Sequence, residues 1–376
     1  MGESIMIYLD NAATTKPSEC AIEAATEAFG SFGNPSSLHR LGMEAEKIIK
    51  DARASVAEKL MVSDNNIYFT SGGTEANNTA ILGYAMANRK RGNHLITTKI
   101  EHPSVLEPFK HLEKSGFSVT YLDVSEGGAI SLKDFEDALR EDTLLVSVMA
   151  VNNETGVIQP FDRLKEVMKK KAPNAVLHSD CVQAFCKIPV FPKKCGIDML
   201  SVSAHKVHAL KGTGGLYIAD NIHINPILLG GGQERGLRSG TENTVGIAAF
   251  SAAIKNYKKI GQEKRTELKE KILKNIPNTY VNGTMENSGY ILNISFEGIK
   301  SEILLHSLEA RGIFVSTGSA CSSHKPQPSH VLTAMGVSHK NIDGAIRFSF
   351  CDEAFDADFV VSVIKEEVEK IRKYVR

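Results

Sequence analysis

The chain has 376 residues, and its 44 lysine and arginine side chains balance 44 aspartate and glutamate side chains, so the formal net charge is zero. That balance argues against a general affinity for nucleic acid or for an anionic membrane surface. No apolar run approaches the roughly 18 residues of a membrane span, and the N-terminal MGESIMIYLDNAATT lacks the basic and apolar blocks of a secretion signal. We therefore expect a cytoplasmic protein whose partners are small molecules or other proteins.

Seven short runs rich in β-branched and aromatic residues predict strands in the first part of the chain. They lie at 66–72, 94–100, 118–124, 143–151, 175–180, 199–205 and 214–219. Helical spacing of apolar residues separates most of them, at 42–60, 75–91, 104–115, 131–140 and 161–172. This alternation predicts a large α/β domain over residues 15–260 with a doubly wound, mostly parallel seven-stranded sheet.

A second, smaller domain is predicted after the glycine-rich turn at 228–241. A helical pattern at 244–275 predicts one long helix that bridges the two domains. Beyond it, strand-like and helical runs alternate at 291–298, 301–311, 345–350 and 355–374. They predict a small α+β domain built from residues 1–14 and 261–376.

The cysteines indicate free thiols. There are six of them, Cys20, Cys181, Cys186, Cys195, Cys321 and Cys351. Because they show no CxxC pair and no dense, even spacing, we expect neither a disulfide framework nor a zinc site.

A glycine-rich turn follows the first predicted strand, in FTSGGTEANN at 69–78. Its glycines let the backbone approach a ligand, and the free N–H groups of the helix start would point at an anion there, with Thr74 adding a hydroxyl. An ordinary helix cap at Thr74 would explain the same residues. The turn does not match the GxxxxGK[ST] pattern of nucleotide sites, so it suits one phosphate better than three.

Two later strands also end in polar residues, which a buried parallel sheet does not otherwise tolerate. Asp180 ends one of them and could hold the protonated nitrogen of a heteroaromatic ring, although it could equally cap a helix. SVSAHK ends the next strand with Lys206, whose amine would attack an aldehyde cofactor or else form an ion pair. Lys211 lies among glycines and is expected to be structural.

These parts occur in the order found in enzymes that use pyridoxal 5′-phosphate (PLP). The chain resembles the class V aminotransferase superfamily and, within it, the cysteine desulfurases of the NifS/IscS type. The resemblance is carried by motifs along nearly the whole chain, among them YLDNAATT, FGNPSSLH, FTSGGTEANN, EHPSVLEP, VNNETGVIQP, SDCVQAF, SAHK, RSGTEN, GSACSS and IRFS. It implies the PLP-dependent transferase fold type I.

The resemblance also implies roles around the cofactor ring. Lys206 would bind the cofactor covalently and His102 would stack on its ring, both as catalytic residues. Asp180 would pair with the ring nitrogen. Gln183 and Asn153 would contact the ring hydroxyl and the substrate.

Residues for the cofactor phosphate are implied in the same way. They are Gly73, Thr74, Ser203, His205 and, from a neighbouring subunit, Thr241. The role of Thr241 requires a homodimer. Arg347 and Asn34, with Asn153, resemble the set that binds the substrate carboxylate, a task that suits a bidentate guanidinium.

Cys321 lies in STGSACSSHKPQPSHVL, a small and polar segment typical of a loop. The resemblance implies that its thiolate attacks the sulfur of L-cysteine, leaving L-alanine and a persulfide that a sulfur-acceptor protein receives for iron–sulfur cluster assembly or another pathway. His324 and Lys325 would favour the thiolate if they face it. No metal site is expected, apart from a transient iron–sulfur ligand role for Cys321.

Two other functions stay open at this stage. The nearest is a selenocysteine lyase or another PLP-dependent β-elimination enzyme, which release of selenide against persulfide would distinguish. The other is a PLP-bound docking component that is inactive without its partner. Cys181 and Cys186 are expected to be held rigidly beside Gln183 and so to be unable to deliver sulfur.

Overall fold

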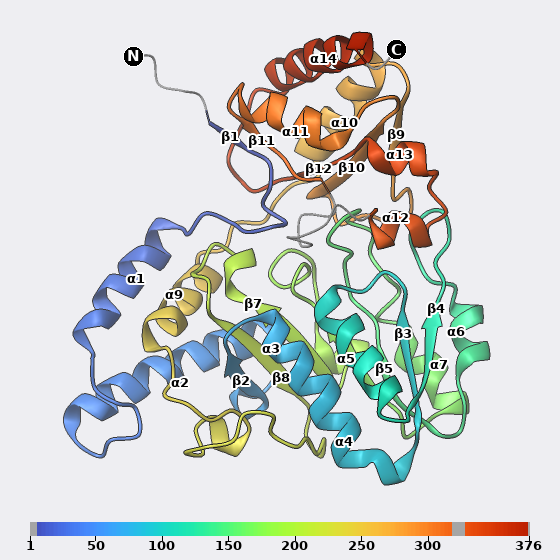
Figure 1. The fold of residues 1–376 in the computed structure, drawn as a ribbon. Coiled ribbons are helices and arrows are strands. Elements are labelled where there is room, and N and C mark those ends of the chain that lie inside the picture. The colour runs from blue at the N-terminus through green and yellow to red at the C-terminus, as the bar shows by residue number, and fades with distance from the viewer. Residues whose placement is uncertain (1–5, 318–327, 375–376) are drawn as a thin grey trace.

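A seven-stranded sheet forms the centre of the larger part of the molecule in the computed structural model, which describes residues 6–317 and 328–374 (Figure 1). Its strands are β2 (Ile67–Thr70), β3 (His94–Thr98), β4 (Ser118–Leu122), β5 (Thr143–Ser147), β6 (Val176–Asp180), β7 (Met199–Ser203) and β8 (Gly214–Ile218). Their order is β2-β8-β7-β6-β5-β3-β4, and only the pairs that involve β8 are antiparallel. The predicted mostly parallel sheet of seven strands is therefore confirmed.

The central strands are buried along their whole length because helices cover both faces of the sheet. A polar side chain can lie there only with partners, and His178 of β6 has them on both sides. Its two ring nitrogens lie 2.8 Å from Ser147 Oγ on β5 and 3.0 Å from Ser201 Oγ on β7. Burial lowers the pKa of His178 to about 3, so the imidazole is neutral and cross-links three strands.

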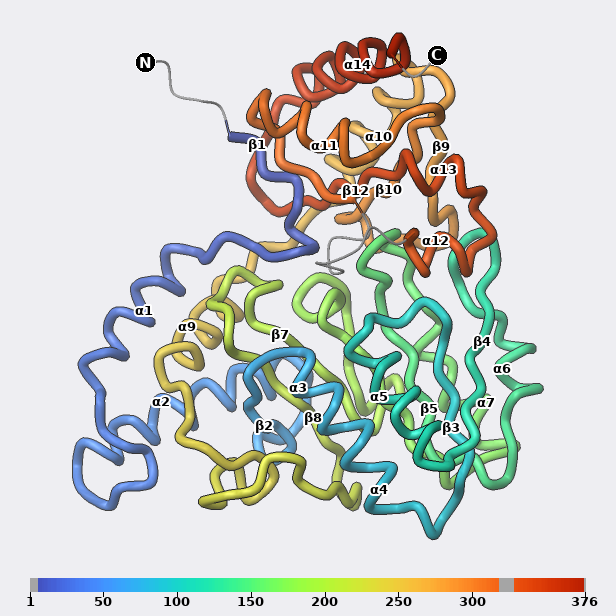
Figure 2. Tube along the Cα trace, viewed as in Figure 1, coloured from blue at the N-terminus to red at the C-terminus, as the bar shows by residue number. Residues whose placement is uncertain are grey.

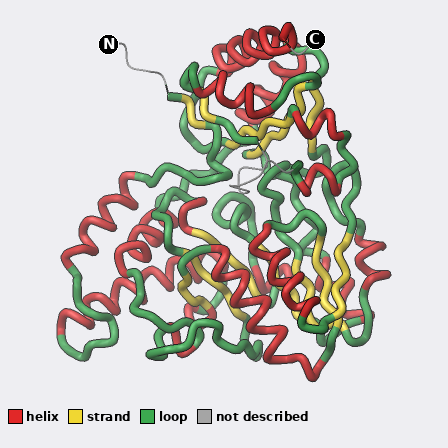
Figure 3. The backbone as a smooth tube through the Cα atoms, viewed as in Figure 1, coloured by secondary structure: helices red, strands yellow, loops and turns green. Residues whose placement is uncertain are grey.

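Two sets of helices form the outer layers (Figure 3). One core cluster unites the sheet with α1 (Glu19–Gly30), α2 (Arg40–Leu60), α6 (Leu132–Ala138), α7 (Leu164–Lys171) and α9 (Thr244–Lys255). The other face is covered by α3 (Gly73–Asn78), α4 (Tyr84–Asn88) and α5 (Pro103–Lys114). A π-helical turn at Thr79–Gly83 joins α3 to α4, and the short α8 spans Pro192–Cys195.

The predicted single helix at 244–275 is wrong. The chain forms α9 and, after a break, α10 (Glu263–Asn275). Asn256 ends α9 by donating from its side-chain amide to the carbonyl of Ala252 at 2.9 Å. The two helices also pack into different cores, since α9 belongs with the large sheet while Leu268 and Ile272 of α10 belong with the smaller part. The apolar spacing continues across the break because both helices are half-buried, which hid the break from the sequence.

The smaller part is built on an antiparallel sheet of order β12-β10-β9, which packs with helices. Its elements are α10, β9 (Thr279–Asn282), β10 (Ile291–Phe296), α11 (Ser301–Glu309), α12 (His330–Ala334), α13 (His339–Asp343), β12 (Ala345–Ser349) and α14 (Ala357–Tyr374). The N-terminal β1 (Ile7–Tyr8) joins this part by pairing with β11 (Ile313–Phe314). In Figure 2 the blue trace runs from β1 beside the smaller part to α1 on the larger part. The domain boundaries at 14 and 261 stay a prediction.

Four parallel strands of the large sheet end toward the smaller part. The chain leaves β3 toward His102, β5 toward Asn153, β6 at Asp180 and β7 toward Lys206. Ligands of open α/β sheets collect at such strand ends. Within the described ranges, no helix combines the length and the apolar character that a membrane crossing needs.

Candidate active site

A cavity of about 270 Å3 lies at these strand ends and also reaches the smaller part of the molecule. Ten residues that the sequence assigned to a cofactor or substrate line it together. They are Gly73, Thr74, His102, Asn153, Asp180, Gln183, Ser203, His205, Lys206 and Arg347. The structure therefore brings together side chains from five strand or helix ends and from β12.

Lys206 lies on the short 3-10 turn Ala204–Lys206 that follows β7 directly. Its half-buried Nζ donates hydrogen bonds of 2.6 Å to the carbonyls of Ala12 and Ala13. These carbonyls belong to the N-terminal YLDNAATT motif, so the motif holds the amine at the cavity wall. Lys211 is exposed and is not among the residues that line the cavity, which agrees with the expectation that it takes no part in the chemistry.

Asp180 is the last residue of β6 and is only 7 % exposed. Its Oδ1 accepts a hydrogen bond from the Val182 backbone N–H at 2.9 Å, and its Oδ2 accepts one from Asn77 Nδ2 at 2.8 Å. Asn77 itself is fully buried, and within the described residues its Oδ1 has no partner. A buried acceptor without a partner at a cavity wall is typical of a site that binds a polar ligand.

His102 caps the N-terminus of α5, which fixes its ring. Its Nδ1 lies 3.1 Å from the Ser104 backbone N–H, which donates to it, and 2.8 Å from Ser104 Oγ. Burial lowers the pKa of His102, the carboxylate of Asp180 opposes this, and Lys206 and His330 lower the pKa further. The ring is therefore neutral with its proton on Nε2, a form suited to packing against an aromatic ring.

The part of the cavity that Gly73 and His205 line is suited to an anion. Gly73 begins α3, and among the described residues no side chain caps the N–H groups of that helix. A Cβ on Gly73 would lie 2.7 Å from Val182 Cγ2, so only glycine fits here without a shift of its neighbours. His205 beside it has its pKa lowered to about 4 by burial, with Lys206, Lys211 and Lys187 adding to the effect.

Arg347 brings a buried cation from β12 into the cavity and is 4 % exposed. Its Nη2 donates to Asp10 Oδ1 at 2.8 Å, and its Nη1 donates to the carbonyl of Asn153 at 3.0 Å. Within the described residues its Nε has no acceptor. The guanidinium is therefore fixed at the cavity, and the N–H groups that Asp10 and Asn153 do not use are left for an anionic ligand.

Three predicted residues are not among the cavity lining. Asn34 is exposed on a turn, where its Oδ1 accepts a hydrogen bond from the Ser36 N–H at 2.9 Å. Thr241 is exposed just before α9. Cys321 lies outside the described residues. The roles of all three stay predictions.

Two buried glutamates at the site were missed by the sequence reasoning, although both lie within quoted motifs. Glu101 accepts hydrogen bonds from Thr98 Oγ1 and the Met149 N–H, and burial raises its pKa to about 8. Burial also raises the pKa of Glu154 to about 7. Only their place beside His102 and Asn153 in EHPSVLEP and VNNETG could have indicated them.

The described residues that flank 318–327 form hydrogen bonds with residues at this site. Before that segment, Ser316 pairs with the backbone of Arg347 in both directions. After it, Ser329 Oγ donates to Glu154 Oε2, and His330 Nε2 lies 2.9 Å from the carbonyl of Glu101. The segment that contains Cys321 therefore leaves and rejoins the described chain beside the cavity.

The five described cysteines give no alternative thiol at the site. None of them is among the residues that line the cavity. Burial raises the pKa of Cys186 to about 12 and also raises the pKa values of Cys181, Cys195 and Cys351. Among the described residues, no group of His, Cys, Asp and Glu is arranged to hold a metal ion.

Comparisons with known proteins agree with this geometry. The family model Aminotransferase class-V matches residues 7–358. A cysteine desulfurase IscS of Methanosarcina thermophila is 43 % identical over 381 aligned positions, which cover 98 % of this chain and 94 % of the relative. A solved NifS-like protein superposes with a TM-score of 0.89 at 36 % identity, covering 97 % of this chain and all of that one. A structure of SspA in complex with cysteine gives a TM-score of 0.84 at 34 % identity over 93 % of this chain and all of that one.

Proposed function

The chain belongs to the class-V aminotransferase family, and from this premise we propose that it is a PLP-dependent cysteine desulfurase whose sulfur acceptor is Cys321. In the overall reaction the C–S bond of L-cysteine breaks, and the released sulfur forms an S–S bond with the protein thiol. The carbon that carried the sulfur gains a proton. Cysteine and thiol thus give alanine and a protein persulfide, and no external oxidant or reductant is needed. The observation that carries the proposal is the convergence of ten predicted residues on one cavity.

The residues of the cavity fit PLP. The close approach of Gly73 to Val182 and the uncapped start of α3 suit the phosphate, with Ser203 beside them. Asp180 presents a buried carboxylate for the ring nitrogen, and Lys206 presents the amine for the aldehyde. When bound, PLP supplies an electron sink for the carbon atoms of the substrate.

Residues of the chain would orient the substrate and move its protons. Arg347 would bind the substrate carboxylate with the N–H groups that Asp10 and Asn153 leave unused, because these two residues hold the guanidinium in place. Lys206 Nζ, held by two carbonyls at the cavity wall, is placed to accept and return a proton. The neutral ring of His102 would close one side of the cofactor ring against water.

Cys321 is the cysteine that remains as an acceptor of the substrate sulfur when the five described cysteines are set aside. The five described cysteines do not line the cavity, and four of them have pKa values raised by burial. The neighbours of the Cys321 segment, Ser316 and Ser329, are held by Arg347 and Glu154 at the site. This arrangement supports a sulfur that is taken up at the cavity and carried to an acceptor protein.

Assembly and partners belong to the same proposal. Thr241 is exposed and lies outside the cavity of its own chain, which agrees with its predicted contact to the cofactor phosphate of a second copy. We propose a homodimer on that ground. An acceptor protein for the persulfide and a cytoplasmic location are likewise expected from the predicted function.

The proposal is tested by one turnover with isotopically labelled L-cysteine followed by peptide mapping of the persulfide. We expect the label on Cys321, and we expect the Cys321→Ala variant to retain the cofactor absorbance while losing alanine formation. Cys186→Ala is the matched control and should keep both. Label that arrives first on Cys181 or Cys186, or alanine formed by Cys321→Ala at the wild-type rate, would show that the acceptor is wrongly assigned.

A further inference from the structure

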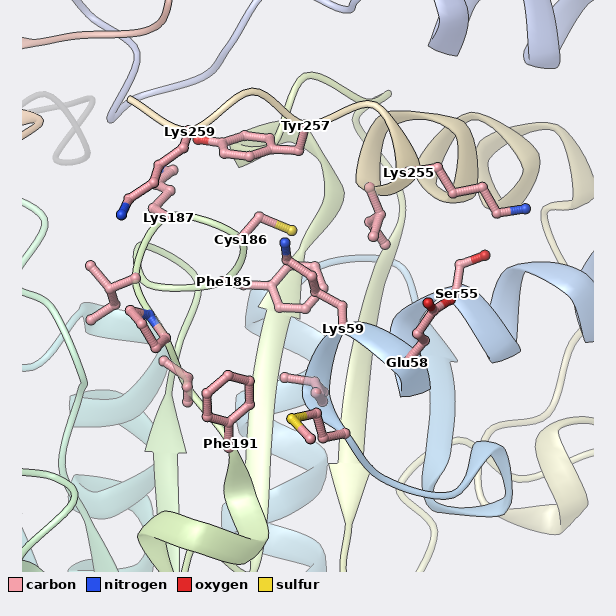
Figure 4. A pocket seen from close by; sticks show the side chains of 16 residues that line it. Ser55, Glu58, Lys59, Phe185, Cys186, Lys187, Phe191, Lys255, Tyr257 and Lys259 are labelled. Atoms are coloured by element: carbon pink, nitrogen blue, oxygen red, sulfur yellow. The ribbon is translucent and has the colours of Figure 1, made fainter. Parts of the chain in front are cut away.

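Lys187 is a buried lysine that lies between two cavities. It is 8 % exposed and lines a second, larger cavity of about 570 Å3. Figure 4 shows that cavity, with Lys187, Cys186 and Tyr257 at its upper side and Phe191 below. A narrow space between the two cavities is lined by Lys187 and by Lys206. Lys187 therefore forms part of the wall behind the proposed cofactor site.

The side chain of Lys187 contacts Gln183, four residues earlier in the chain. Its Nζ donates to Gln183 Oε1 at 3.2 Å and lies 5.0 Å from the ring centroid of Tyr290. The Tyr290 hydroxyl in turn donates to the Gln183 backbone carbonyl at 2.5 Å. Lys187 and Tyr290 thus hold Gln183 by its side chain and by its backbone.

These contacts determine which way the Gln183 amide faces. Lys187 Nζ donates to the amide oxygen of Gln183. On the other side, the carbonyl of Ala12 only accepts, and Gln183 Nε2 donates to it at 2.9 Å. The carbonyl of Ala12 therefore imposes this orientation, and the donation from Lys187 agrees with it. The second N–H of Nε2 is left for a ligand in the cavity that Gln183 lines.

The charge of Lys187 bears on the same site. Burial lowers the pKa of Lys187 to about 7, Lys206 lowers it further and Cys186 opposes this. Tyr290 and Tyr257, which line the narrow space with it, have pKa values raised by burial and are neutral. Within the described residues, no carboxylate forms an ion pair with Lys187. Two amines that share a poorly solvated region disfavour positive charge on each other, which is why the nearby Lys206 adds to the lowered pKa of Lys187.

We propose that Lys187 is a positioning residue, which holds Gln183 so that its free amide N–H faces the ring hydroxyl of the cofactor. The inference rests on the proposed function, because it needs PLP in the smaller cavity. The larger cavity gives it a matched control, since Lys59 lines that cavity with an exposed side chain and, among the described residues, forms no hydrogen bond with Gln183.

The first test compares Lys187→Met with Lys59→Met. Methionine keeps much of the apolar stem that packs at Tyr290 but cannot donate to Gln183. We expect Lys187→Met to bind PLP about tenfold more weakly, the scale of one lost hydrogen bond to a charged group. We also expect the pH midpoint of the bound cofactor's visible absorbance to rise, because Lys187 carries a positive charge below its pKa of about 7 and methionine carries none. Lys59→Met should change neither quantity, and an unchanged Lys187→Met would overturn the inference.

A double-mutant cycle separates positioning from general damage. In a Gln183→Leu background, adding Lys187→Met should weaken PLP binding by less than about twofold, because the residue through which it acts is gone. Full additivity would overturn the inference. Lys187→Arg keeps a donor and a charge and should restore the absorbance midpoint.

The Gln183→Glu variant tests the inference even if Lys187→Met does not fold. The new carboxylate can accept from Lys187 but has no N–H for the cofactor, so we expect PLP affinity to fall as in Lys187→Met. Wild-type affinity in Gln183→Glu would overturn the inference. Failure of the wild-type protein to bind PLP would instead overturn the proposed function, so the two failures are distinguishable.

Discussion

The cavity that Lys187 lines and the cavity that Gln183 lines differ in size and in the side chains that surround them. The larger one, of about 570 Å3, is rimmed by the exposed lysines Lys59, Lys255 and Lys259 and walled by apolar side chains. The smaller one, of about 270 Å3, lies at the strand ends and is lined by buried polar groups. The comparison teaches that buried polar groups at the ends of parallel strands, rather than volume, single out the cavity that we propose as the reactive site.

Unpaired polar atoms sharpen this contrast. Asn77 and Arg347, which line the smaller cavity, each have one buried atom without a partner among the described residues, Oδ1 and Nε respectively. The larger cavity has Tyr257 Oη in the same condition. An unpaired acceptor beside a buried carboxylate and an unpaired guanidinium N–H suit a zwitterionic substrate and its cofactor, whereas one hydroxyl in an open groove specifies little.

Replacing Lys206 should have the largest effect. We expect Lys206→Ala to lower the rate of alanine formation by about 10²–10⁴-fold, the range contributed by a positioned proton-transfer group. Lys211→Ala, which changes an exposed lysine nearby, should leave the rate unchanged. Steady-state kinetics would check both, and equal losses in the two variants would break the contrast between the buried and the exposed lysine.

The next largest effect is expected at Arg347. Arg347→Gln removes the buried guanidinium that we assign to the substrate carboxylate, so KM for L-cysteine should rise about 10- to 100-fold, as for the loss of a charged hydrogen bond. The exposed Arg311 gives a control in Arg311→Gln, which should keep the wild-type KM. A change in kcat alone would argue against a carboxylate contact at Arg347.

Gly73→Ala tests the closeness of packing at the phosphate end. A Cβ there would lie 2.7 Å from Val182 Cγ2. We expect a loss of about 1–3 kcal/mol in PLP binding or in stability, the usual result of overpacking. Gly30→Ala is the control, because a Cβ at Gly30 meets nothing within 4 Å. Equal PLP affinities and melting temperatures in the two variants would contradict the packing argument.

A pH series on stability tests the buried amine behind the site. The pKa of Lys187 falls from 10.5 to about 7 on folding, so between these pH values the unfolded chain binds a proton that the folded chain does not. Stability should therefore rise with pH in this window, by at most about 1.4 kcal/mol per unit. Chemical denaturation of wild type and Lys187→Met should show this extra slope only in the wild type. Parallel curves would contradict a neutral buried amine.

The smallest effect is expected in the larger cavity. Lys255→Ala removes an exposed charge from its rim, and we expect stability to change by less than about 0.5 kcal/mol. Alanine formation should stay within about twofold of the wild type. A severe loss of activity would mean that the larger cavity takes part in the reaction, which would break the comparison.

Local patterns in the sequence predicted the large sheet, and the resemblance to a known family indicated most of the residues that line the smaller cavity. Fully buried strands such as β5 read as continuous apolar runs, and Asp180 and Lys206 stand out where such runs end. The break between α9 and α10 escaped prediction, because it depends on which of two cores each helix joins.

Lys187 shows a second limit of sequence reasoning. In CVQAFCKIPV it is one lysine among apolar residues, and only the fold brings its Nζ to Gln183 and Tyr290. Asn34 and Thr241 show a third limit. Their predicted contacts with the substrate and with the cofactor of a neighbouring subunit involve more than one chain or a ligand, so they stay predictions.

The most direct test of the smaller cavity as the reactive site is to find which lysine binds the cofactor. Lys206 lines the smaller cavity, whereas Lys187, with its pKa lowered to about 7, lines the larger one. Borohydride reduction of the PLP-loaded protein, followed by peptide mass mapping, makes the link permanent and locates it. Pyridoxyl mass on the peptide that contains Lys206 is the predicted result, and pyridoxyl mass on Lys187 or Lys211 would contradict the account.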